Sequence, residues 1–139
     1  MTQEEKQLLL KDLCARLPYD VMVDYESHIY VLNEIDPSCK DIDYITVRIQ
    51  DVERLMCAGS VMIEDIKPYL RPMSSMTEEE KREYKHLIAF SGNPIGSANL
   101  IDWLNKKMFA CRTIDDKDDK DMFELGLAIK VTEYNNPYD

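Results

Sequence analysis

The chain has 139 residues, of which 45% are hydrophobic and 32% charged, and its formal net charge is −10. This length suffices for one domain with its own core, and the composition excludes a disordered chain. No apolar run approaches the roughly 18 residues of a membrane span, and the polar, acidic N-terminus is unlike a secretory signal. We therefore expect one cytoplasmic domain over residues 1–139, without membrane contact.

The acidic residues are concentrated in one part of the chain. Residues 18–65 carry 11 acidic against 3 basic side chains, a local charge of −8. Direct nucleic-acid binding is not expected, because phosphate backbones are recognised by Lys and Arg. We expect instead a protein partner with a basic surface. The candidate contact residues are Asp20, Asp24, Glu26, Glu34, Asp41 and Asp43. In the alternative interpretation, the acidity only keeps a small protein soluble.

The first segment, residues 1–17, has the pattern of a helix. Thr2 and Glu5 form a capping-box pair, and Pro18 cannot continue a helix. Four leucines recur at helical spacing and predict the buried stripe: Leu9, Leu10, Leu13 and Leu17. The charged side chains, including Asp12 and Arg16, are expected mostly on the other faces.

Residues 18–73 have the period of two that is typical of strands. It is clearest over 44–50, where Ile45, Val47 and Ile49 alternate with polar side chains. Residues 58–60 predict a turn, and Pro68 and Pro72 are expected to end the β unit. Several short strands with close turns predict an antiparallel meander, which in one alternative curls into a small SH3-like barrel.

Residues 77–134 are predicted to be mainly helical. Thr77 and Glu80 form a second capping box, so we expect a helix from there to Phe90. Ser97 is the expected cap of a further helix that ends at Lys107, and a short strand is expected over 127–131. The overall prediction is an α+β fold: an N-terminal helix, a β unit, two helices and a short C-terminal segment.

The Asp- and Lys-rich stretch 115–121 suggests a calcium loop at first sight. An EF-hand counted from Asp115 needs Gly at position six and Glu at position twelve, but these positions hold Lys120 and Gly126. The pattern fails, and a solvated charged loop is the better interpretation.

No catalytic, nucleotide-binding or metal-binding motif occurs in the sequence, so we expect a non-enzymatic protein without a cofactor. The cysteines form no CxxC pair and neither histidine lies near a cysteine, which predicts reduced thiols rather than a metal site. A Cys-His pair assembled only by the fold stays open. The residues concerned are Cys14, Cys39, Cys57, Cys111, His28 and His86.

One segment combines rigidity with cationic and aromatic groups. In residues 66–72 (IKPYLRP), Lys67, Tyr69 and Arg71 alternate with Pro68, Leu70 and Pro72, and the two prolines make the segment rigid. They could present one side to an anionic ligand. The alternative is a stiff linker whose Tyr and Leu side chains pack under the β unit.

The same segment is part of a family resemblance. Residues 66–84 (IKPYLRPMSSMTEEEKREY) resemble the hallmark of uncharacterised proteins of Bacteroides, their prophages and their phages. Residues 8–19, 102–109 and 125–129 are similar to further motifs of that family, whereas the stretch 115–121 departs from it. The resemblance implies no activity and no site residues. It implies a mobile-element accessory protein in a bacterial cytoplasm.

Two functional hypotheses follow from these features. The first is a non-enzymatic phage- or prophage-type accessory protein whose acidic surface contacts a host protein, in an anti-defence role for example. The second is a protein that binds or sequesters a nucleotide-like anion through Lys67, Tyr69 and Arg71. The oligomeric state is not predicted.

Overall fold

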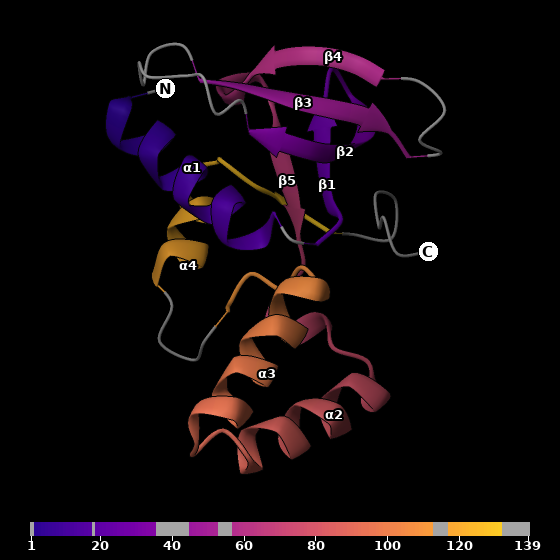
Figure 1. Ribbon diagram of the computed structural model, residues 1–139, viewed down its shortest axis with the longest axis vertical. Coiled ribbons are helices and arrows are strands. Elements are labelled where there is room, and N and C mark those ends of the chain that lie inside the picture. Colours follow the sequence, from indigo (N-terminus) through magenta and orange to yellow (C-terminus); the bar gives the residue numbers. More distant parts are fainter. Residues whose placement is uncertain (1, 18, 36–44, 53–56, 113–116, 132–139) are drawn as a thin grey trace.

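The computed structural model describes residues 2–17, 19–35, 45–52, 57–112 and 117–131 (Figure 1). Its helices and strands are α1 (Gln3–Arg16), β1 (Val21–Tyr25), β2 (His28–Ile35), β3 (Thr46–Asp51), β4 (Cys57–Met62), β5 (Lys67–Leu70), α2 (Glu78–Ala89), α3 (Pro94–Lys106), α4 (Lys117–Glu124) and β6 (Ile129–Lys130). Two 3₁₀ turns, η2 (Ile63–Asp65) and η3 (Met73–Ser75), flank β5. The predicted α+β class is confirmed.

The strands form one sheet in the order β4-β3-β2-β1-β5-β6. β1 to β4 are the predicted antiparallel meander, β5 pairs antiparallel with the other side of β1, and β6 pairs parallel with β5. Because this linear order leaves β4 and β6 as edges, the SH3-like barrel is not confirmed. Figure 1 shows α1 beside the sheet and the α2–α3 pair projecting away from it. We call α1, α4 and the sheet the body, and α2 with α3 the hairpin.

The N-terminal helix begins as predicted, with both hydrogen bonds of the Thr2–Glu5 capping box present. Its fully buried Leu9 and Leu13 pack into the same core as the inward-facing side chains of the strands. However, Asp12 and Arg16 are fully buried too, contrary to the expectation that the charges lie on outer faces. Their burial depends on partners from distant parts of the chain, described below.

Two strand predictions were wrong. The expected turn at 58–60 lies inside β4, where a register shift opposite Ile49 and Gln50 absorbs the local irregularity. The connection around Pro68 is a strand, β5, with Pro68 opposite Val23. The sheet accommodates a proline there because β6 pairs only with Tyr69 and Leu70, so β5 has one partner strand at Pro68.

The hairpin has well-defined helix ends. The capping box of Thr77 and Glu80 starts α2 as predicted. α3 starts earlier than expected, because the Asn93 side chain accepts a hydrogen bond from the Gly96 N–H and Pro94 occupies the first turn. A Cβ on Gly96 would lie 1.6 Å from the Phe90 carbonyl oxygen. Only glycine therefore permits this close approach between the end of α2 and the start of α3.

The predicted solvated loop was wrong where the structure describes it, since residues 117–124 form α4. Asp119 and Met122 are fully buried on one side of this helix. A pattern of hydrophobic residues cannot predict a buried aspartate. Asp119 can be buried here because Arg16 of α1 donates a hydrogen bond to its carboxylate. The short C-terminal strand is present as β6.

Two apolar clusters result from this arrangement. The larger one lies between α1, α4 and the sheet, with Leu9, Val23 and Ile49 among its fully buried members. The smaller one lies between the hairpin and the chain around it, with Leu104 and Phe109 at its centre. The body and the hairpin thus have separate cores, and charged groups connect them.

Candidate functional site

The three residues of the predicted anion site lie in very different environments. Lys67 is exposed, whereas Tyr69 and Arg71 are 5% and 9% exposed. The Tyr69 hydroxyl donates a long hydrogen bond of 3.5 Å to Asp24 Oδ1. Burial, and then the Asp24 carboxylate, raise the pKa of Tyr69. Only Lys67 is therefore presented openly to solvent.

Arg71 connects the body to the hairpin. Its Nη1 and Nη2 donate to Glu80 Oε2 and Oε1 at 2.8 and 2.7 Å, a two-pronged ion pair. The Arg71 guanidinium lies 4.5 Å from the centre of the Phe109 ring. The backbone N–H of Arg71 donates to the Met108 carbonyl, and the Arg71 carbonyl accepts from the Ala110 N–H. The hydrogen bonds from Arg71 are the main reason that the pKa of Glu80 is lowered to about 2. We call Arg71, Glu80 and Phe109 the junction. An anion at Arg71 would have to compete with Glu80.

Some carboxylates of the predicted acidic surface are paired with other groups of the protein itself. Glu34 pairs with Arg48 at 3.1 Å on the neighbouring strand, and Asp24 accepts from Tyr69. Asp20 and Glu26 are exposed, Glu26 at the tip of the β1–β2 turn. Asp41 and Asp43 lie outside the described residues. The described acids therefore contribute a diffuse negative field more than one continuous contact patch.

Four charged side chains of the body form a buried quartet that the sequence patterns missed. Arg16 donates to both oxygens of Asp12, at 3.2 and 3.1 Å, and to Asp119 Oδ1 at 2.6 Å. Arg112 Nη1 lies 3.3 Å from Asp12 Oδ1, and the backbone N–H of Arg112 donates to Asp119 Oδ2 at 2.8 Å. Since all four residues are at most 7% exposed, the quartet joins α1, α4 and the segment after α3. The spacing of Asp12 and Arg16 by four residues was its one sequence signal.

Burial acts strongly on one member of the quartet. Loss of hydration raises the pKa of Asp119 to about 7, assisted by the neighbouring Asp12 and opposed by Arg16 and Arg112. The quartet therefore connects α1, α4 and the segment after α3 through buried charged groups.

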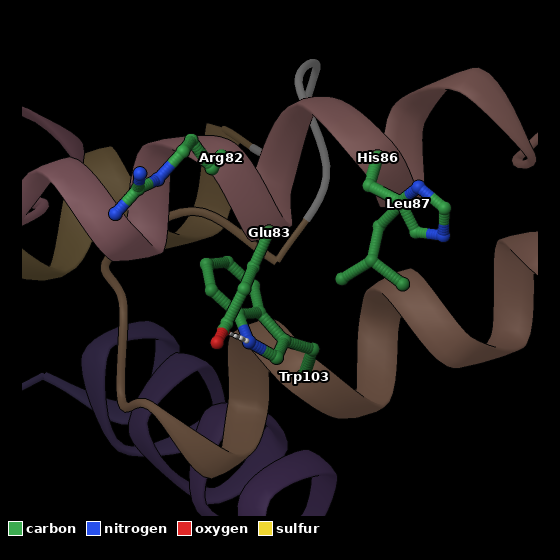
Figure 2. A pocket seen from close by; sticks show the side chains of 5 residues that line it. All are labelled: Arg82, Glu83, His86, Leu87 and Trp103. Carbon is green, nitrogen blue, oxygen red and sulfur yellow. Dashed lines mark hydrogen bonds between the residues drawn. The ribbon is translucent and has the colours of Figure 1, made fainter.

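A pocket of about 440 Å³ lies on the hairpin (Figure 2). Its lining residues are Arg82, Glu83, His86 and Leu87 of α2, and Trp103 of α3. Figure 2 shows Arg82 and His86 at opposite ends of the pocket, with Glu83 hydrogen-bonded to the indole between them. The volume is within the range of small ligand sites, but the pocket lies open on a helix surface.

The indole that forms the floor of this pocket is held in place from three sides. Trp103 Nε1 donates to Glu83 Oε2 at 2.9 Å. The ring stacks on Tyr84 at a centroid distance of 6.1 Å and contacts Phe109 at 5.5 Å. Phe109 also contacts the Arg71 guanidinium. The pocket is therefore connected to the junction through the Phe109 ring. The sequence patterns contain no signal for this pocket.

Two observations on the described residues bear on catalytic and metal chemistry. The pocket contains His86, and no cysteine lines it. Within the described residues no group of three or more His, Cys, Asp or Glu side chains could hold a metal ion. No helix of the described residues is long and apolar enough to cross a bilayer.

Comparisons of the chain with protein-family models, with curated proteins and with solved structures found no match. The resemblance to the Bacteroides and phage family therefore stays a prediction.

Proposed function

We propose that this chain is a non-enzymatic accessory protein that acts by binding another protein. One observation carries the proposal. Beside the Trp103 pocket, Phe90 and Ile95 are 57% and 76% exposed at the tip of the hairpin. Clustered exposed apolar side chains next to a rigid aromatic ring are typical of protein-binding surfaces. We call Leu87, Phe90, Ile95 and Trp103 the hairpin patch.

The acidic side chains of the body contribute to this proposal in a second way. A net charge of −10 favours encounter with a basic surface and discourages binding to nucleic acid. Because Asp24 and Glu34 have partners inside the protein, we assign the acidic surface to steering and the hairpin patch to contact. The family resemblance adds a context: a phage or prophage protein that binds a host protein in the cytoplasm, with an anti-defence role as one use.

The proposal is tested by photo-crosslinking in cells. A photoreactive phenylalanine analogue replaces Ile95 in one variant and Lys120 in a control variant, and both are expressed in a Bacteroides host. Lys120 is exposed on α4, away from the hairpin. We expect discrete crosslinked protein species from position 95 and none from position 120. Equal labelling at both positions, or none at either, would contradict the proposal.

The alternative, sequestration of a nucleotide-like anion, has weaker support. Two of its three residues, Tyr69 and Arg71, are buried and already bonded to Asp24 and Glu80. Thermal-shift assays against a nucleotide panel test it, and stabilisation that disappears in Lys67→Ala would favour it.

A further inference from the structure

We infer that the hairpin pocket binds an acidic segment of the partner protein that carries a large apolar side chain. This inference rests on the proposed function and specifies the chemistry of the contact. It assigns the contact to the α2–α3 pocket and not to the acidic surface of the body.

The pocket offers a preformed apolar contact for one large side chain. Leu87 and the Trp103 ring are partly buried and line it together. The indole is held by Glu83 and by two aromatic neighbours, so little conformational freedom is lost when a ligand packs against it. Rigid aromatic groups of this kind are the usual anchors of protein interfaces.

Apolar surface continues from the pocket towards the tip of the hairpin. The Phe90 ring contacts the His86 ring at a centroid distance of 4.9 Å, and His86 lines the pocket. Ile95 is exposed at the start of α3, across the turn that joins the two helices. A binding surface that extends beyond one pocket favours a polypeptide segment over a small molecule.

The hairpin lacks the negative charge of the rest of the chain. Residues 78–107, which include all of α2 and α3, carry five basic and five acidic side chains and are neutral in a chain of −10. The one carboxylate in the pocket, Glu83, is hydrogen-bonded to Trp103. A partner segment with carboxylates therefore meets no net negative charge on the hairpin, and the cations on the pocket rim complement it.

Two cations on this rim are available for a partner. Arg82 lines the pocket, and Lys85 is exposed one turn later on α2. Within the described part of the chain neither has an ion-pair partner, whereas Lys81 pairs with Glu78 at 3.2 Å. Arginine and lysine with no internal carboxylate gain most from an incoming one. The rim thus favours a segment with carboxylates beside its apolar side chain.

The inference is tested with purified protein and a defined peptide. The probe is a 12-residue peptide with one Phe, one Leu and four Glu, without Trp. Trp103 is the one tryptophan of the chain, so its fluorescence reports directly on the pocket. We expect a saturable change in emission with a Kd of roughly 10–100 μM, which weakens several-fold when salt rises from 50 to 500 mM. Calorimetry supplies an independent Kd.

Matched controls separate charge from apolar contact. Replacing the four Glu of the peptide by Lys, or its Phe and Leu by Ser, should abolish the response. The double variant Arg82→Glu/Lys85→Glu should weaken binding about tenfold or more. Lys117→Glu/Lys120→Glu changes the net charge equally on exposed positions of α4 and should bind within about twofold of the unaltered protein. Circular dichroism checks that each variant is folded.

Each other outcome has a defined meaning. Equal binding of the Lys peptide, or no effect of the Arg82/Lys85 reversal, would overturn the inference. A Trp103 response to nucleotides but not to the peptide would indicate a small-molecule site. Concentration-dependent Trp103 emission without peptide, matched by dimer formation in sedimentation, would indicate a second copy as the occupant, and both results count against the inference.

The inference and the proposed function can fail separately. If crosslinking at Ile95 captures a host protein but the acidic peptide does not bind, only the assigned partner chemistry is wrong. If neither experiment is positive, the hairpin patch is not a binding surface.

Discussion

The body and the hairpin of this protein differ in how completely they bury their side chains. In the body, even charged residues such as Arg16 and Asp119 are fully buried. In the hairpin, Phe90 and Ile95 are 57% and 76% exposed, whereas Val52 and Leu125, at the ends of β3 and α4, are 48% and 51% exposed. Burying charge is costly, and exposed large apolar groups add little to stability. We infer that the body provides most of the stability, and the more exposed apolar side chains at the hairpin tip are those that we propose for contact with a partner.

Breaking the buried quartet should have the largest effect on stability. Arg16→Met removes the group that bonds to both Asp12 and Asp119, which leaves two buried carboxylates with Arg112. We expect a loss of about 3–5 kcal/mol in the free energy of unfolding, measured by urea denaturation. Lys11→Met, on an exposed position of the same helix, should lose less than about 1 kcal/mol. A similar loss in both variants would show that the quartet does not hold the body together.

The pH dependence of stability should divide between the two regions. The pKa of Glu80 in the junction is lowered to about 2, which means that the folded protein favours the ionised side chain. This ionised side chain stabilises the fold above the ordinary pKa of about 4.5. The stabilisation, up to about 3 kcal/mol, is lost as the pH falls towards 2. The pKa of Asp119 is raised to about 7, which means that the folded protein favours the protonated side chain. The stabilisation that results is complete below the ordinary pKa of aspartate and is lost as the pH rises from about 4 to 7.

These two effects are separable by substitution. Glu80→Gln should flatten the acid side of the stability profile, and Asp119→Asn the side between pH 4 and 7. Urea midpoints from pH 2.5 to 8 provide the measurement. An unchanged profile in either variant would refute the corresponding assignment.

Weakening the junction should loosen the hairpin more than the body. Arg71→Lys keeps the charge but loses the two-pronged bond to Glu80 and the stacking on Phe109. We expect a loss of about 1–2 kcal/mol. In hydrogen exchange, the amides of α2 and α3 should lose protection before those of β1 to β3 do. Equal loss throughout would mean that the two regions open as one unit.

A turn in the body should be improvable by substituting its two central residues. Glu26 and Ser27 connect β1 to β2 with φ values of 50° and 66°, the conformation of a type I′ turn, which favours Asn-Gly. Glu26→Asn/Ser27→Gly should therefore stabilise the protein by about 1 kcal/mol, measured as a higher thermal midpoint. Destabilisation would indicate that Glu26 or Ser27 contributes a contact of its own.

The smallest expected effect on stability comes from an exposed apolar side chain of the hairpin, compared with a buried one. Ile95→Ser removes an apolar side chain that is 76% exposed, so stability should change by less than about 0.5 kcal/mol. Leu104→Ala, in the hairpin core at 1% exposure, should cost about 2–5 kcal/mol. A large loss from Ile95→Ser would mean that this side chain serves folding rather than binding.

Local patterns were sufficient to predict most elements of this fold. The capping boxes at Thr2 and Thr77 were identified because each depends on residues three positions apart. The meander from β1 to β3 was predicted because alternation of apolar and polar residues follows directly from strand geometry. The α+β class, the first helix and the acidic character of the chain were thus determined by the sequence itself.

Everything that depends on partners distant in sequence was decided by the tertiary structure. The sequence could not show that Arg16 meets Asp119, that Arg71 is held by Glu80 rather than free for an anion, or that residues 117–124 become a helix around a buried aspartate. The hairpin pocket belongs to the same class, since Leu87 of α2 and Trp103 of α3 are brought together only by the packing of the two helices. Whether such a side chain is covered depends on what the rest of the chain places over it, and here part of the hairpin surface is left open.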